Sequence, residues 1–269
     1  MKPIFFLIPA VQAGTVIWNG IFNESSTVDQ LDEWSWSNQV GAYQWYIHGS
    51  EKTNHYLEVS PDFKNPESKD AKGIRMTIVP TRHLSPLTLS RGYKQTNIST
   101  QDETASWNGQ TMMRTELIPQ TKSDLGSGTL FYHFSLQTRE KNPPNAKIEH
   151  QIAFFESHFT ELQYGGSEPT LRWMAGGESH WETDLKAGVW YNFAYEIDFS
   201  GQTVALWASE GAKPLARVGD DAVSASTETN SQDWHVGELR LDNGAAGGGV
   251  EDWFWSGVYV ESGEITKEV

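Results

Sequence analysis

The sequence predicts an all-β protein: a jelly-roll sandwich of two antiparallel sheets with a cleft on its concave face. Three observations predict this class. About ten or more short apolar segments are separated by turns rich in Gly, Pro and Asn, several of them alternate between apolar and polar residues, and no segment carries an apolar stripe of 3.6-residue period over the length of a helix. The chain has 269 residues, which suits one domain because sandwiches of roughly 200 to 250 residues are common.

The first predicted strands cover residues 15–18, 42–48 and 73–79. The second combines aromatic and β-branched residues, and the third alternates cleanly, with its apolar side chains Ile74, Met76 and Ile78 turned inward. Residues 80–106 are then polar and irregular. A loop of this length inside a compact domain is usually functional or mobile.

The next predicted strand, residues 111–118, carries charge on one face. Its side chains alternate, so that Arg114 and Glu116 point to the same side, opposite to Met113 and Leu117. Arg114 can therefore lie beside Glu116 and favour its ionised form. A face with such a pair is either exposed to solvent or lines a cleft.

The remaining predicted strands follow the same patterns. Residues 128–138 alternate, and residues 188–199 and 202–209 form the clearest hairpin, joined at Ser200 and Gly201. Further strands are expected at residues 150–157, 161–164, 169–174, 234–241 and 253–260, the last two separated by a Gly-rich loop.

Composition excludes several classes of partner. The formal charge is −15 with a pI near 4.9, so nucleic acids and anionic membrane surfaces would repel the chain. Cysteine is absent, which removes disulfides, thiolate metal sites and Cys nucleophiles. No spacing of acidic residues resembles a calcium loop, although a jelly roll can hold a structural calcium. We expect no metal, no cofactor and a monomer.

The first thirteen residues predict a secretory signal peptide. One basic residue, a short apolar run and Ala13 favour cleavage before Gly14, and a first β-strand is the alternative. We therefore expect a secreted protein with a single domain over residues 14–269. Asn23 and Asn97 begin tripeptides of the N-glycosylation type.

Three long motifs in the same order are similar to those of fungal glycoside hydrolase family 131. They lie at residues 36–48, 107–121 and 150–165, and the resemblance extends from about Thr15 to Val260. It implies a secreted jelly-roll enzyme that hydrolyses β-1,3/1,6- and β-1,4-glucans. The family wording before the Thr-Glu of the second motif tends to have two Arg residues, whereas this chain has Met113 and Arg114. By alternation the missing Arg would point away from Glu116.

The resemblance implies that Glu116 and Glu156 are catalytic and that His235 accompanies them. Hydrolysis of a glycosidic bond needs two carboxyl groups, one that gives a proton and one that is ionised. Glu156 follows Phe154 and Phe155, so we expect it to be desolvated, with a raised pKa that suits a general acid. Without the motifs, each Glu would be interpreted as an ordinary surface residue, and His235 as a half-buried structural His.

Six further residues are candidates for substrate binding. Aromatic side chains stack on sugar rings and polar ones bind hydroxyl groups. Ordinary packing is the alternative, and it is favoured for the two His residues. The candidates are Arg114, Gln151, Trp45, Tyr46, His133 and His150.

Two alternatives to a glucan-hydrolysing enzyme stay open at this point. A β-glucan-binding lectin on the same scaffold would need neither Glu116 nor Glu156 for binding. A polysaccharide lyase usually needs a basic groove, and 20 Lys and Arg residues against 35 Asp and Glu residues make that class unfavourable. The sequence leaves open whether cleavage retains or inverts the anomeric centre.

Overall fold

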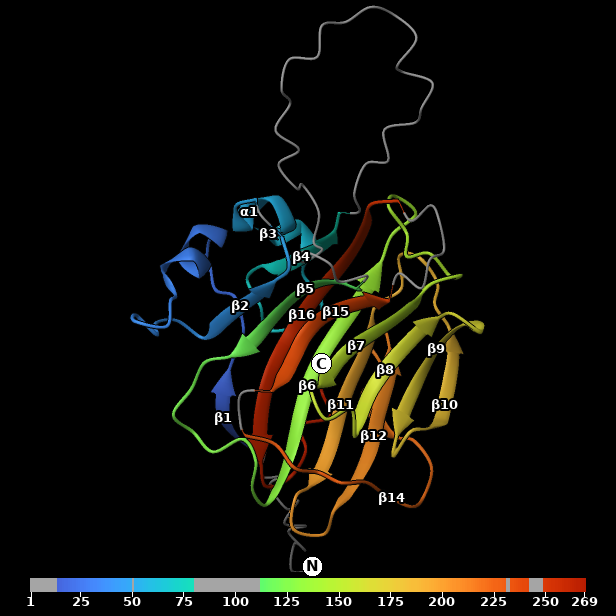
Figure 1. The fold of residues 1–269 in the computed structure, drawn as a ribbon. Helices are drawn as coiled ribbons and strands as arrows, with labels where there is room; N and C mark the ends of the chain where they lie inside the picture. Colours follow the sequence, from blue (N-terminus) through green and yellow to red (C-terminus); the bar gives the residue numbers. More distant parts are fainter. Residues whose placement is uncertain (1–13, 50, 80–111, 231–232, 242–248) are drawn as a thin grey trace, which may run out of the picture.

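Two antiparallel sheets pack face to face in the computed structural model, which describes residues 14–49, 51–79, 112–230, 233–241 and 249–269 (Figure 1). The expected signal peptide and the 80–106 loop lie outside these residues, as does Asn97. The predicted all-β jelly-roll class is confirmed. Within the described ranges, helices are limited to η1 (Val28–Glu33), α1 (Thr53–Tyr56) and η2 (Pro61–Phe63), and none is long and apolar enough to cross a membrane.

The seven-stranded sheet has the order β10-β9-β8-β7-β15-β5-β2. Its central strands β7, β15 and β5 are far apart in sequence and are hydrogen-bonded side by side. The strand bounds are β2 (Tyr43–Ile47), β5 (Met112–Pro119), β7 (Glu149–Phe155), β8 (Thr160–Gly165), β9 (Glu168–Ala175), β10 (Glu178–Asp184) and β15 (Trp234–Leu241).

The nine-stranded sheet has the order β13-β12-β11-β6-β16-β4-β3, with β1 paired to β16 and β14 paired to β12. The predicted hairpin is its β11–β12 pair. The strand bounds are β1 (Thr15–Asn19), β3 (Leu57–Ser60), β4 (Gly73–Ile78), β6 (Thr129–Thr138), β11 (Tyr191–Asp198), β12 (Thr203–Glu210), β13 (Ala216–Arg217), β14 (Val223–Ser224) and β16 (Glu251–Ser262).

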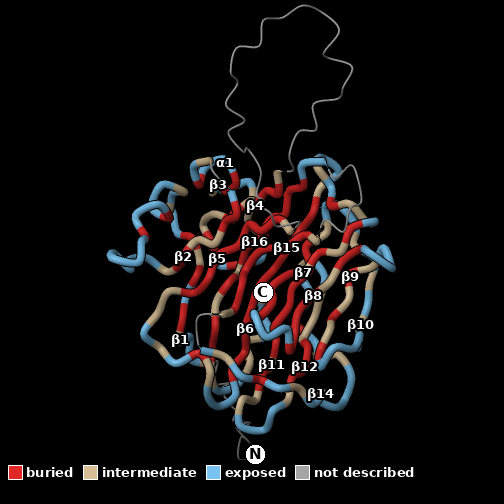
Figure 2. Tube along the Cα trace, viewed as in Figure 1, coloured by how far each residue is buried: buried red, intermediate tan, exposed pale blue. Residues whose placement is uncertain are grey.

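The most buried residues lie on the facing strands of the two sheets (Figure 2), and the core between the sheets is strongly aromatic. Trp234 of β15 makes edge contacts with Tyr132 of β6 and with Trp18 of β1, at ring-centroid distances of 5.0 Å and 6.2 Å. Large rings of this kind bury much apolar area and interlock at an angle. The sheet that carries the motifs is therefore held rigidly on its inner side, which leaves its outer face for polar side chains.

Strand β5 shows how the alternation assigns the two faces. Met113 and Leu117 belong to the core, and Thr115 between them donates a 2.9 Å hydrogen bond to the carbonyl of Thr77 on β4. Arg114 and Glu116 must then lie on the outer face. The expectation that position 113 points away from Glu116 is confirmed.

Candidate active site

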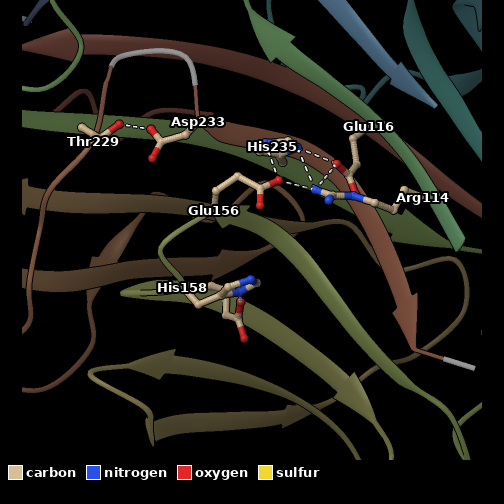
Figure 3. A network of polar contacts seen from close by, with 8 residues as sticks. Arg114, Glu116, Glu156, His158, Thr229, Asp233 and His235 are labelled. Carbon is tan, nitrogen blue, oxygen red and sulfur yellow. Dashed lines mark hydrogen bonds and ion pairs between the residues drawn. The ribbon is translucent and has the colours of Figure 1, made fainter. Parts of the chain in front are cut away.

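Arg114 and Glu116 form a buried, bidentate ion pair on the outer face of β5 (Figure 3). The Arg114 Nε donates to Glu116 Oε1 at 2.8 Å and its Nη2 donates to Oε2 at 2.9 Å. The side chain of Arg114 is 7% exposed and that of Glu116 is fully buried. Because a bidentate pair of this geometry is among the stronger hydrogen-bonded ion pairs, the two side chains hold each other in fixed positions.

His235 of β15 lies between two carboxylates. Its Nδ1 is 2.5 Å from Glu116 Oε2, and its Nε2 is 3.1 Å from Glu156 Oε1. The ring is almost completely buried. The close approach of β15 to β5 depends on Gly237, whose φ is +144° and where a Cβ would lie 2.3 Å from the carbonyl oxygen of Thr115. Only glycine fits there, so the backbone of the next strand comes near enough for His235 to contact Glu116.

Glu156 reaches the outer face because β7 is irregular. Ile152 and Phe155 point into the core, although regular alternation would place them on opposite faces. The change occurs at Ala153, which has a left-handed φ of +49° and lies where the β15–β7 register shifts. Such a bulge re-aims the side chains beyond it. Glu156, which follows the end of β7, is thereby turned toward β5, where its Oε1 accepts a 2.5 Å hydrogen bond from Arg114 Nη2.

Two aromatic rings enclose the charged groups. The guanidinium carbon of Arg114 lies 4.7 Å from the ring centroid of Tyr46 and 5.3 Å from that of Phe154. Phe154 also stacks on His235 at 4.9 Å with an interplanar angle of 12°. Cation–π contacts and stacking exclude water from one side of the cluster, which strengthens the electrostatic interactions inside it.

The electrostatics differ from the sequence expectation for Glu156. Its side chain is 47% exposed, and Phe155 is turned away from it into the core. Burial raises the pKa of Glu156, but the hydrogen bond and the charge of Arg114, with a smaller contribution from His235, outweigh burial and hold that pKa below its usual value. The expectation of a desolvated Glu156 with a raised pKa is therefore wrong for the protein without substrate. The reason is that Arg114 lies within hydrogen-bond distance of Glu156, a contact that the strand pattern does not predict.

The imidazole of His235 lies between the two carboxyl groups, with one ring nitrogen facing each. Its Nδ1 also lies 3.3 Å from Arg114 Nη2. A neutral imidazole has one N–H and can donate to only one of the two carboxylates, whereas an imidazolium donates to both. The ring is therefore placed where a proton could pass between Glu116 and Glu156.

The structure brings together Arg114, Glu116, Glu156, His235 and Tyr46, and it places Gln151 on the same face of β7. The three other candidates lie elsewhere, and the structure corrects the expectation that they lie near the catalytic pair.

His150 is fully buried between the sheets, with Nε2 2.6 Å from Glu251 Oε2 of β16. It lies on the core side of β7 because the bulge at Ala153 separates its face from that of Glu156. His133 belongs to β6 of the nine-stranded sheet, where it contacts Glu261 at 2.9 Å. These contacts satisfy both rings as structural groups.

Trp45 alternates with Tyr46 and therefore points to the opposite side of β2. It packs against the core and lines a hollow of about 370 Å³ together with Asp29, Asp32 and Tyr56. It is thus separated from the cluster by the sheet itself.

Two residues beside the cluster are missed by the strand pattern. In the sequence Phe154 is only an apolar neighbour of Glu156, and His158 lies just beyond the predicted strand of residues 150–157. His158 stacks on Phe154 at 5.2 Å, with an interplanar angle of 4°, and its Nδ1 is 2.6 Å from Glu161 Oε2. The spacing of His158 and Glu161 was the available signal, since a turn that leads into a strand can bring such residues together. In the described part of the chain, no three His, Asp or Glu side chains are grouped so that they could hold a metal ion.

Comparisons with known proteins identify the family. Residues 16–266 match the family model described as the glycoside hydrolase 131 catalytic N-terminal domain. No curated protein sequence matches the chain. Among solved structures, the catalytic domain of a glycoside hydrolase family 131 protein from Coprinopsis cinerea is 47% identical, with a TM-score of 0.82, and the match covers 95% of this chain and 98% of that one. A family 131 β-glucanase catalytic domain from Podospora anserina is 44% identical, with a TM-score of 0.83 and coverage of 95% and 99%. This chain therefore belongs to glycoside hydrolase family 131 and is a glycoside hydrolase.

Proposed function

We propose that this enzyme hydrolyses β-1,3/1,6- and β-1,4-glucans, with Glu116 and Glu156 as its catalytic pair and His235 as the group that passes a proton between them. The observation that carries the proposal is the position of His235, whose two ring nitrogens each contact a carboxylate from a different strand. The β-glucanase from Podospora anserina, to which the chain is 44% identical, supports the substrate class.

The two carboxyl groups have different surroundings, as glycoside hydrolysis needs. Glu116 is buried and bound twice by Arg114, whereas Glu156 is half exposed and is the carboxyl that can touch a sugar. When a substrate displaces the contact between Arg114 and Glu156, the carboxyl of Glu156 loses the cation that lowers its pKa. A proton from His235 can then convert Glu156 to the acid form.

An exposed tryptophan that contacts the segment beyond β5 through Trp34 supports a polymeric substrate. Trp36 is 74% exposed and makes an edge contact with Trp34 at 5.2 Å. Trp34 donates from Nε1 to Gln120, which continues the outer-face alternation of Glu116 along β5. Four residues of strand span roughly 13 Å from Glu116 to Gln120, and Trp36 lies one ring contact beyond Trp34, so it offers a stacking surface several sugar units from the catalytic pair.

Reducing-sugar release from laminarin and from a soluble β-1,4-glucan tests the proposal. Glu116→Gln and Glu156→Gln keep the size of each side chain and remove its acid–base chemistry. We expect each variant to lose about a hundredfold or more of kcat/KM with an unchanged circular dichroism spectrum. Wild-type protein that binds glucan and releases no sugar would overturn the proposal in favour of a lectin.

The same variants separate the two roles. A variant that lacks the acid keeps most of its activity on an aryl glucoside with a good leaving group, because that reaction needs no proton. A variant that lacks the base or nucleophile loses both reactions, and added azide restores activity. We expect the first behaviour from Glu156→Gln and the second from Glu116→Gln.

We also propose that the enzyme acts outside the cell, on the strength of residues 1–13. N-terminal sequencing of protein recovered from culture medium tests this, since cleavage before Gly14 is expected and an intact N-terminus would contradict it.

A further inference from the structure

A second pair of an imidazole and a carboxylate lies next to the catalytic cluster (Figure 3). His158, two residues after Glu156, approaches Glu161 Oε2 of β8 with its Nδ1 at 2.6 Å. Glu161 is 3% exposed, and its other oxygen accepts a 2.5 Å hydrogen bond from Gln163 Nε2. The carboxylate is thus fixed on both oxygens, and it fixes the ring that contacts it.

Three features hold the ring of His158 in one orientation. It lies parallel to Phe154, and the ring of Phe154 in turn stacks on His235. The backbone of His158 has a left-handed φ of +52°, a conformation that costs a non-glycine residue about 1 kcal/mol or more. Its N–H donates a 2.7 Å hydrogen bond to the carbonyl of Phe155, which closes the turn after β7. Strain maintained at one residue by this many contacts is typical of functional positions.

One ring nitrogen remains available. The side chain of His158 is 40% exposed, and among the described residues its Nε2 has no hydrogen-bond partner. The hydrogen bond to Glu161 raises the pKa of the imidazole above its usual value, and the charges of Glu161 and Glu156 add to this rise. Burial and the charge of Arg114 act in the opposite direction without cancelling it. A fixed imidazole with a free, solvent-facing N–H is preorganised to bind an oxygen of a ligand.

We propose that His158, oriented by Glu161, donates a hydrogen bond from Nε2 to a sugar hydroxyl of the substrate, at a subsite on the β8 side of Glu156. Glu161 is on β8 and Glu156 follows β7, so this subsite lies across the sheet from Tyr46 on β2. The inference rests on the proposed glucan substrate. It adds a binding residue that the alternation of the strands did not indicate.

The protonation of His158 gives the subsite a pH dependence. The charged groups that face the ring are Glu161 on β8, Glu156 after β7 and Arg114 on β5. The imidazolium donates from Nε2 below its raised pKa. As pH rises through that pKa, the remaining proton stays on Nδ1 beside Glu161 and Nε2 becomes an acceptor. A hydrogen bond from a charged donor is stronger than a neutral one by enough to change binding about tenfold.

The test is the pH profile of kcat/KM on a glucan oligosaccharide for wild type, His158→Phe and Glu161→Gln. Phenylalanine preserves the stack on Phe154 and removes the donor, so we expect about a tenfold rise in KM at low pH and loss of the decline at high pH. Glu161→Gln removes the charge that favours the imidazolium, so the same decline should move to lower pH. The matched control is His180→Phe, on the exposed edge strand β10, where Nε2 already pairs with the Ala175 carbonyl, and its profile should equal that of wild type.

The outcomes are distinguishable. Unchanged KM and an unchanged pH profile in both His158→Phe and Glu161→Gln would overturn the inference while the glucanase activity stands. If His158→Phe does not fold, the shift in Glu161→Gln decides alone. If wild type hydrolyses no glucan, the proposed function fails, and retardation in a gel that contains laminarin still reports binding: equal retardation of wild type and His158→Phe, or none of either, overturns the inference.

Discussion

Replacing Arg114 with methionine is expected to destabilise the protein strongly and in a way that depends on Glu116. Methionine has a similar length and can still pack beside Tyr46 and Phe154, but it makes none of the three hydrogen bonds that Arg114 donates to the two carboxylates. The two bonds to Glu116 matter most, because both partners are buried. The bond to Glu156 counts for little, since Glu156 is 47% exposed and water screens it.

The expected loss is about 3 to 5 kcal/mol in the free energy of unfolding, the usual cost of leaving one member of a buried pair without its partner. Against a typical total of about 5 to 15 kcal/mol, this is a large fraction. Urea denaturation at neutral pH measures it. In Arg114→Met the buried charge of Glu116 is left without its partner, and Glu116→Gln removes that charge. The double variant should therefore be more stable than the sum of the two single losses predicts, by about 1 to 3 kcal/mol.

The same variant has a kinetic signature. Arg114 lowers the pKa of Glu156, so the ionised form of Glu156 persists to lower pH in wild type than it does without the cation. In Arg114→Met the basic limb of the pH–activity profile, where the proposed general acid Glu156 loses its proton, should therefore move to higher pH. Additive stability losses in the double variant, within about 0.5 kcal/mol, together with an unmoved basic limb, would refute the central role given to Arg114.

Two further substitutions test features away from the Arg114 pair. Glu238 is fully buried, its carboxyl oxygens have no partner with hydrogen-bond geometry among the described residues, and burial followed by neighbouring carboxylates raises its pKa well above the usual value. The stability that its proton provides is therefore present below the unfolded pKa of about 4.3 and is lost as pH rises toward the folded pKa. Glu238→Gln carries no such proton, so in urea denaturation its free energy of unfolding should rise relative to that of wild type by up to about 1.4 kcal/mol per pH unit over this range. Parallel curves of stability against pH would contradict this. Trp36→Ala should raise KM for long glucans about two- to tenfold and leave KM for a disaccharide or trisaccharide unchanged. The melting temperature should also stay unchanged, because Trp36 is 74% exposed. Equal changes in KM for short and long substrates would exclude a distant stacking surface.

The strands that the sequence predicts well are those with one apolar and one polar face. Residues 111–118 and the hairpin of residues 188–199 and 202–209 correspond to β5, β11 and β12. Strand β10 was not predicted, because it is an exposed edge strand with charged side chains and little apolar alternation. Periodicity reports burial on one face, and such an edge strand lacks that signal.

The contact between Arg114 and Glu116 follows from local geometry, since i and i+2 on a strand share a face. The position of Glu156 does not, because Ala153 adopts a left-handed conformation that no propensity of alanine predicts and that reverses the alternation of β7. The placement of His235 depends on strand order, which joins residues more than a hundred positions apart. Local patterns carry no information on such a pairing.

The order of strands has a consequence for how the chain is completed. In the seven-stranded sheet β15 lies between β7 and β5, and in the nine-stranded sheet β16 lies between β6 and β4. Of the two last described strands, β15 is thus an inner strand of the seven-stranded sheet and β16 an inner strand of the nine-stranded sheet. Until they pair, β7 and β5 each expose an open edge, and a long loop must close before either sheet is continuous.

During synthesis these two inner strands of the sandwich are therefore made after the strands that flank them. A growing chain that has reached Glu156 already contains Arg114 and Glu116 but lacks the strand that spaces them and carries His235. The cluster of Arg114, Glu116, Glu156 and His235 therefore cannot assemble before β15 has been made and has paired between β7 and β5. Closure of the seven-stranded sheet and formation of the cluster are one step in this protein.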